Sequence, residues 1–160
     1  MEELIKYFVF YLDSQMFAIL LHRIETIVLM VEIDPLPKVP EYILGAINYH
    51  GDIIPVVNLR KLFALPDKQV ELSDHLIIVK TPKQTIALWV DALGKIIERG
   101  LTDISKSTKF FYKTDSVSSV TKLDDKIVLI QDLDKLLSEN EITLLQHAIN
   151  QHKKNTKSTM

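Results

Sequence analysis

Cysteine, net charge and long apolar runs are all scarce in this sequence, and each absence excludes a class of protein. The 160 residues include no cysteine and carry a formal net charge of -2. The chain therefore forms no disulfide and no thiolate metal site, which suits a reducing compartment. Its balanced charge gives no electrostatic footprint for nucleic acid. No apolar run approaches the ~18 residues that span a bilayer. The first residues, MEELIKYFVF, are unlike a secretory signal, so we expect a cytoplasmic protein without direct membrane insertion.

The common catalytic and metal-binding motifs are missing as well. There is no G-x-G-x-x-G, P-loop, G-x-S-x-G or H-E-x-x-H pattern. The histidines are scattered, and His147 and His152 are five residues apart, which does not place two ligands on one helix face. We expect no metal, no cofactor and no enzymatic activity.

An internal repeat organises the chain. Lys6–Val28 aligns without gaps with His75–Ile97, and Asp52–Phe63 aligns with Lys126–Leu137. Chance similarity between apolar strands is the competing explanation, since Val and Ile recur in any sheet. Two matches in the same order, the second ending in a shared polar-Leu-x-Lys-Leu pattern, favour duplication. We therefore predict two similar half-units, at about 3–65 and 74–137.

Each half-unit has the pattern of short strands joined by turns. The TPKQ segment at 81–84 has proline where a type I turn favours it. Strands of this length and spacing predict a mainly β fold of two small five-stranded antiparallel barrels rather than parallel β-α-β units. Asn58 and Asp132 each follow a strand and precede Leu-x-Lys-Leu. Each is predicted to cap one helical turn.

The C-terminal segment is the exception and predicts an α-helix at about 139–152. Ser138 and Glu141 fit a capping box, and apolar residues follow at helical spacing. We expect this helix to pack against the barrels and residues 154–160 to form a flexible tail. The polar segment 103–116 is predicted to be a mobile loop.

The stretch YILGAINYHGDIIPVVNLRKLF, at 42–63, contains the residues that most resemble a site. His50 and Gly51 occupy the position of a tight hairpin turn, where positive φ is needed. Pro55 cannot donate to a sheet ladder, so its strand is predicted to be an edge or bulged there. Gly45 indicates a bend or a close backbone approach. A conformational role thus explains each of these residues.

A catalytic role for the same stretch is the competing hypothesis. It would be a small-molecule-binding or hydrolytic β-barrel that uses His50 with Asp52 or Asn48. A catalytic base needs a partner that orients it, and none is evident in the sequence. This hypothesis rests on proximity alone.

The segment VEIDPLPKVPEYILGAINYHGDIIPVVNLRKLFALP resembles the signature of the chemotaxis coupling-protein (CheW) family, x-PLP-x-x-P-x-x-I-x-G-x-x-N-x-x-G-x-x-IPV-x-x-L-x-x-x-F. The segments YFVFYLDSQMFAILLHRIETIV and VTKLDDKIVLIQDLDKLL match the same family in order. The resemblance extends from about Lys6 to Leu137, plus the terminal helix. The same motifs occur in the regulatory domain of the family's histidine kinase, but this chain is too short to carry a kinase domain.

This resemblance implies a non-catalytic adaptor of two SH3-like barrels that couples the cytoplasmic tips of chemoreceptors to a CheA-type histidine kinase. In the family, the receptor's helical hairpin lies in the groove between the halves, and the kinase's related domain docks barrel to barrel. Carried over by position, the groove would include Ile24, Thr26, Gly45, Asn48 and His50.

Two positions depart from the family pattern. Many members have Glu at the position of Thr26 and Arg at the position of His50, so both partners of a possible ion pair are absent here. An exposed ion pair contributes little to stability. We therefore expect an unaffected fold and an altered receptor specificity. The alternative is an adaptor of a non-flagellar chemosensory system that controls pili or surface behaviour.

Overall fold

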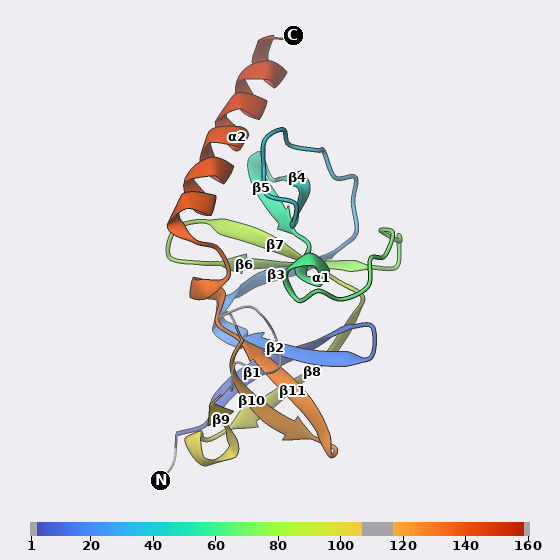
Figure 1. Ribbon diagram of the computed structural model, residues 1–160, viewed down its shortest axis with the longest axis vertical. Helices are drawn as coiled ribbons and strands as arrows, with labels where there is room; N and C mark the ends of the chain where they lie inside the picture. Colours follow the sequence, from blue (N-terminus) through green and yellow to red (C-terminus); the bar gives the residue numbers. More distant parts are fainter. Residues whose placement is uncertain (1–2, 107–116, 159–160) are drawn as a thin grey trace.

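The computed structural model describes residues 3–106 and 117–158 of the chain. They form two curled β-sheets, stacked along the long axis of the molecule, with one long helix beside the upper sheet (Figure 1). None of the described helices combines the length and the apolarity needed to cross a membrane. The predicted mobile loop at 103–116 lies outside the described residues from 107 onward.

The lower sheet in Figure 1, here called barrel 1, has the strand order β8-β1-β2-β11-β10-β9. Its strands are β1 (Ile5–Leu12), β2 (Gln15–Leu20), β8 (Ala92–Arg99), β9 (Ser105–Lys106), β10 (Val117–Leu123) and β11 (Lys126–Gln131). The upper sheet, barrel 2, has the order β3-β6-β7-β5-β4. Its strands are β3 (Ile24–Leu29), β4 (Ile43–Tyr49), β5 (Asp52–Val57), β6 (His75–Lys80) and β7 (Thr85–Val90). The two five-stranded barrels agree with the predicted fold class, and barrel 1 adds the short β9.

The strands are not divided between the barrels as the sequence predicted. The β1–β2 hairpin completes barrel 1 by parallel pairing of β2 with β11, which comes from the second half of the chain. The β6–β7 hairpin completes barrel 2 by parallel pairing of β7 with β5, which comes from the first half. The predicted half-units 3–65 and 74–137 are therefore not separate bodies, because the halves exchange hairpins.

The exchange has a simple physical origin. Because the two halves repeat the same strands, a hairpin of one half fits the equivalent place beside the strands of the other. The connections after β2 and β7 are a 3-10 turn at Leu21–Arg23 and the single residue Asp91. These short links carry the chain directly from one barrel to the other.

The strand order agrees with the predicted repeat. By the alignments, β1, β2 and β3 correspond to β6, β7 and β8, and β5 corresponds to β11. Exchanging each strand of β8-β1-β2-β11-β10 for its counterpart gives β3-β6-β7-β5-β4, which is the order of barrel 2. The two barrels are thus related by a twofold pseudo-symmetry in their topology.

The repeat extends to the two helical turns. At α1 (Leu59–Leu62), the Asn58 side chain accepts a hydrogen bond of 3.1 Å from the Arg60 backbone N–H. At the 3-10 turn Leu133–Lys135, Asp132 accepts one of 3.0 Å from the Asp134 N–H. Both predicted caps are confirmed.

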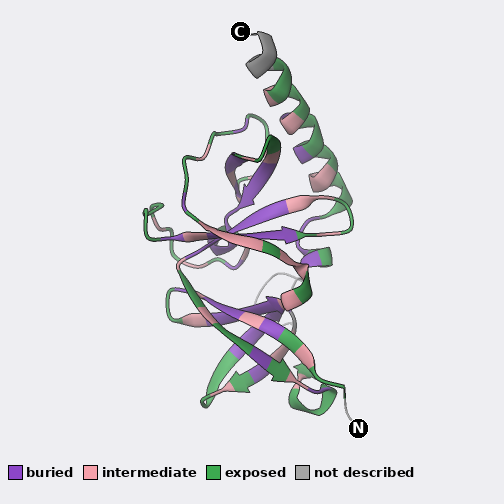
Figure 2. Cartoon of the chain, turned by 180° about the vertical axis from the view of Figure 1, so that it is seen from behind, coloured by how far each residue is buried: buried purple, intermediate pink, exposed green. Residues whose placement is uncertain are grey.

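Alternate side chains along each strand face two different cores. One face points into its own barrel, as Val9 does in barrel 1 and its counterpart Ile78 does in barrel 2. The other face packs between the barrels, where Phe10 and its counterpart Val79 belong to the largest apolar cluster. Figure 2 shows the buried parts of the strands gathered where the two barrels meet. Strands buried on both faces explain the continuous apolar runs in the sequence.

The C-terminal helix α2 (Glu139–Ser158) begins as predicted and ends later. The predicted capping box is confirmed, because the Glu141 N–H donates to Ser138 Oγ (3.2 Å) and the Ser138 N–H donates to the Glu141 carboxylate (2.9 Å). Leu145 and Ala148 pack on the cluster between the barrels. Residues 154–158, predicted as a flexible tail, continue the helix, so the helix ends six residues later than the predicted 152. This segment has no glycine or proline to end it.

One buried side chain, Gln131 at the end of β11, yields the first prediction. It is 3% exposed, and neither its amide oxygen nor its nitrogen has a hydrogen-bond partner among the residues that the structure describes. Its counterpart in the repeat, Val57, is fully buried. An unpaired buried amide costs about 1–3 kcal/mol. We expect Gln131→Val to raise the free energy of unfolding by an amount of this order, measured by urea denaturation.

The control is Gln69→Val at an exposed position, for which no comparable gain is expected. A Gln131→Val variant that is less stable than the parent chain would contradict this assignment.

Candidate functional site

The turn between β4 and β5 carries the predicted residues His50 and Gly51. Their φ angles are +51° and +88°, which confirms the predicted tight turn. The Gly51 N–H donates a hydrogen bond of 2.9 Å to Asn48 Oδ1. The His50 ring lies edge-on to the Tyr49 ring, with centroids 4.2 Å apart. The exposed tip is therefore a defined shape, and the Asn48 side chain helps to hold it.

Gly45 and Pro55 also have conformational roles. A Cβ atom on Gly45 would clash with the Asp34 backbone oxygen, because Asp34 pairs with Ala46 through two backbone hydrogen bonds of 2.8 and 2.9 Å. The predicted close backbone approach is confirmed, and Gly45 itself is buried. Strand β5 lies inside the sheet, but its ladder with β7 begins only at Val56. Pro55 therefore lies where one side of the strand is still unpaired.

The other candidate groove residues lie at the surface of barrel 2. Ile24 and Thr26 are half-buried on the edge strand β3, and Asn48 and His50 are exposed on β4 and its turn. Ile24 also packs against the apolar cluster between the barrels. Among the described residues, no hydrogen bond or ion pair joins Thr26 to His50.

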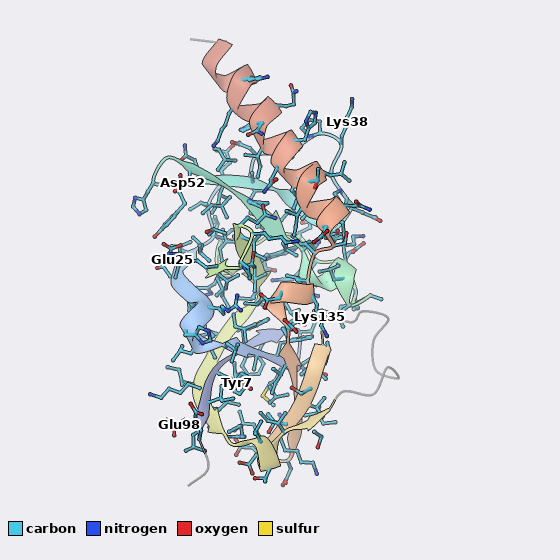
Figure 3. All side chains as sticks on the ribbon, turned by 90° about the vertical axis from the view of Figure 1, so that its left-hand side faces the viewer. Tyr7, Glu25, Lys38, Asp52, Glu98 and Lys135 are labelled. Atoms are coloured by element: carbon cyan, nitrogen blue, oxygen red, sulfur yellow. The ribbon has the colours of Figure 1, made fainter. Side chains whose placement is uncertain are left out.

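Figure 3 shows the flank of barrel 2 that carries these residues. The labelled Glu25 and Asp52, neighbours of Thr26 and of the turn, lie on the same side of the molecule in this view. No described hydrogen bond or ion pair links His50 to Asp52 or Asn48, as a hydrolytic site would require. The described residues also contain no group of three or more His, Asp or Glu side chains that could hold a metal ion.

Barrel 1 has a cavity of its own, of about 270 Å³. It is lined by Tyr7, Leu20, Arg23, Ile130 and Asp134, among others. The Arg23 guanidinium binds the Asp134 carboxylate with two hydrogen bonds of 3.0 and 3.1 Å, which tie the turn after β2 to the turn after β11. None of the predicted groove residues lines this cavity. The sequence analysis missed the Arg23–Asp134 pair because its members are 111 residues apart.

A buried ion-pair network around Arg60, on α1, joins the barrels on another side. The Arg60 side chain is 3% exposed and donates hydrogen bonds of 2.9 and 3.0 Å to Asp13, in the β1–β2 turn of barrel 1. It also binds the Asp91 carboxylate, at the link from β7 to β8, and the Pro66 backbone oxygen. The hydrogen bond from Arg60 lowers the pKa of Asp13. The pair is therefore charged at neutral pH and holds α1 against barrel 1.

Asp74, just before β6, is the buried acid at the other end of this network. Its carboxylate accepts hydrogen bonds from Lys68 Nζ (2.6 Å), the Glu71 N–H (2.9 Å) and Trp89 Nε1 (2.9 Å). Burial would raise the pKa of Asp74, but these hydrogen bonds outweigh it and the pKa is lowered. Lys68 also lies 3.4 Å from Asp91. The network thus runs without a break from the segment before β6 to the β1–β2 turn.

The comparisons with known proteins agree with this architecture. The family model described as "CheW-like domain" matches residues 6–141. The chain belongs to the CheW-like family. The chemotaxis protein CheW of Thermotoga maritima is 31% identical over 133 residues, which cover 81% of this chain and 85% of that protein. The chemotaxis protein CheW of Bacillus subtilis is 26% identical over 136 residues, covering 84% and 87%.

A solved structure in the same family supports the fold directly. The crystal structure of the scaffolding protein TtCheW from Thermoanaerobacter tengcongensis matches with a TM-score of 0.78 and 30% sequence identity. The match covers 88% of this chain and 91% of that one. The predicted family resemblance and the predicted two-barrel fold are both confirmed. Barrel 2 forms in this CheW-like chain with Thr26 and His50, two residues that cannot form an ion pair with each other.

Arg60 provides the second prediction. Replacing it with Met removes the hydrogen bonds that Arg60 donates to Asp13 and Asp91. Asp91 keeps Lys68 and the Asp13 N–H as partners, and Asp13 is half exposed. Losing one partner of a buried hydrogen bond costs about 1–3 kcal/mol, and we expect Arg60→Met to lower the free energy of unfolding by an amount of this order in urea denaturation. The matched control is Lys61→Met, because Lys61 forms only exposed pairs with Asp67 and Glu41. A loss no larger than that of the control would contradict the role assigned to Arg60.

The lowered pKa of Asp74 provides the third prediction. Because its pKa is lower in the folded than in the unfolded state, its charge stabilises the fold above the unfolded pKa of about 3.9. That stabilisation is lost as the pH falls through the folded pKa. Between pH 5 and pH 2.5, we expect the free energy of unfolding to fall less for the Asp74→Asn variant than for the parent chain. Urea denaturation at each pH measures this difference. Asp125→Asn, in an exposed turn, should keep the parent pH dependence.

Proposed function

We propose that the chain is a chemotaxis adaptor that holds the cytoplasmic tips of chemoreceptors and a CheA-type histidine kinase in one assembly, without catalysing a reaction. The observation that carries this proposal is the CheW-like family match over residues 6–141, together with the likeness to a solved scaffolding protein. An adaptor with these partners acts in the cytoplasm. It needs two faces that can be occupied at once, and the two barrels offer them.

The proposed receptor surface comprises Ile24, Thr26 and His50. Ile24 reaches the junction between the barrels, while Thr26 lies on an open strand edge. The His50 ring is exposed at the tip of a hairpin that Asn48 keeps in shape. Gly45 contributes to this surface through its backbone alone, since it is buried under Asp34. Contacts of this kind are small and transient, with moderate affinity.

The fourth prediction restores the charges of the family pattern. We expect the double variant Thr26→Glu, His50→Arg to change the affinity for a chemoreceptor's cytoplasmic hairpin by at least about fivefold, or about 1 kcal/mol. The affinity for the regulatory domain of a CheA-type kinase should change less. Both are measured by isothermal titration calorimetry with purified partners encoded in the same genome as this chain.

The repeat supplies a matched control. Lys95 and Asp124 of barrel 1 occupy the positions equivalent to Thr26 and His50. The double variant Lys95→Glu, Asp124→Arg should leave the receptor affinity unchanged. If Thr26→Glu, His50→Arg altered neither affinity, the surface assignment would be wrong. If the parent chain bound neither partner, the proposed function itself would be wrong.

A further inference from the structure

Barrel 2 has an apolar cavity whose lining includes none of the proposed receptor-surface residues. It has a volume of about 500 Å³ and lies between the segment after β3 and the segment before β6. Figure 1 shows the segment before β6 on the side of barrel 2 opposite α2. We call it the Val31 cavity. Its walls include Val31, Val70 and Leu72, and its floor includes Met30, Ile33 and Leu44.

The walls of the Val31 cavity expose large apolar side chains to an unusual degree. Leu72 is 87% exposed and Val31 is 48% exposed, and the adjacent Leu29 is 65% exposed. The floor continues into the interior of barrel 2, where Met30 is buried and Ile33 and Leu44 pack on the same cluster. A contiguous apolar surface of this kind marks an interaction site, whereas single exposed apolar side chains do not.

The two walls are fixed relative to each other by Asp74. The N–H of Met30, the floor residue that precedes the wall residue Val31, donates a hydrogen bond of 3.1 Å to the Asp74 backbone oxygen. The Glu71 N–H, on the other wall, donates one of 2.9 Å to the Asp74 carboxylate. A cavity whose walls are already held in place loses little conformational entropy when a partner binds.

The charge at the rim indicates what kind of partner fits. Of the described residues that line the Val31 cavity, Glu32 and Glu71 are the charged ones. Among the described residues, neither carboxylate forms an ion pair within 4.0 Å, and the nearby Lys68 is engaged by Asp74 and Asp91. A partner that covers the apolar walls would therefore bind more tightly if it also carried positive charge beside its apolar side chains.

We propose that the Val31 cavity binds an amphipathic helix of a partner protein, with apolar side chains on one face and Lys or Arg beside them. A helix in a groove presents anchors at positions i, i+3 or i+4 and i+7, which suits an open cavity with exposed apolar walls. The inference goes beyond the proposed function and does not depend on it. Thr26 and His50 lie near the start of β3 and beyond the end of β4, whereas the cavity adjoins the end of β3 and the start of β4. Both surfaces can therefore be occupied together.

The test uses a model helix as the probe. Two labelled peptides share one apolar face of Leu residues, and one carries Lys where the other carries Glu. Binding to the full chain is measured by fluorescence anisotropy. We expect the Lys peptide to bind at least about tenfold more tightly than the Glu peptide, a difference of about 1.4 kcal/mol. The double variant Glu32→Lys, Glu71→Lys should reverse this preference.

A second variant tests the apolar walls. Val31→Ser, Leu72→Ser changes two exposed side chains, so the fold is retained, and it should weaken Lys-peptide binding by at least about fivefold. The matched control is Leu101→Ser on barrel 1, which is 76% exposed and should bind as the parent chain does. The proposal is overturned if charge reversal leaves the peptide preference unchanged, or if the control weakens binding as much as the wall variant. It is also overturned if the parent chain dimerises through these walls, seen as a mass in light scattering that falls to one chain in the wall variant.

Discussion

The orientation of the two barrels depends on one buried guanidinium, that of Arg60. Removing such a charge from water costs several kcal/mol unless partners compensate for it. Asp13 and Asp91 supply two carboxylates, while Nε of Arg60 has no partner within the described part of the chain. Apolar faces alone can pack in many relative orientations, but the paired hydrogen bonds to Asp13 fit one geometry. The network therefore selects a single arrangement of the barrels, whereas the apolar cluster between them provides most of the favourable free energy.

The sequence predicted those parts of the fold and of the candidate site that depend on interactions between residues close together in the chain. The turn at His50 and Gly51, the caps Asn58 and Asp132 and the start of α2 are set by neighbours a few residues away, and all were predicted correctly. The hairpin exchange was not predictable, because a repeat makes both pairings equally compatible with the pattern of apolar residues. The Arg60 network and the Arg23–Asp134 pair were missed because their partners are distant in sequence. Nothing in NLRKLF distinguishes a buried arginine from an exposed one.

In the candidate site, some residues fix the shape of the backbone and others only present a side chain for contact. Gly45, Asn48 and Gly51 match the family pattern because the backbone needs them, since each either adopts a positive φ or holds the turn. Thr26 has no such backbone role, and His50 has a positive φ but an exposed side chain. These two are the positions that depart from the pattern. A surface can thus change its chemistry while the hairpin beneath it keeps its form. This is why sequence similarity identifies the family more readily than it identifies the partner.

The duplicated fold then explains how one small chain can present several different surfaces. The tip of barrel 2 has His50 and Asp52 where the equivalent turn of barrel 1 has Asp124 and Lys126. Duplication supplies two copies of one frame, and each copy has diverged at its exposed tips. For a protein that holds other proteins at fixed positions, the frame must be stiff where the copies meet. The Arg60 network provides that stiffness, and it continues through Lys68 to Asp74 beneath the Val31 cavity. The surfaces on barrel 2 therefore keep a constant position relative to barrel 1, which any assembly built on both barrels requires.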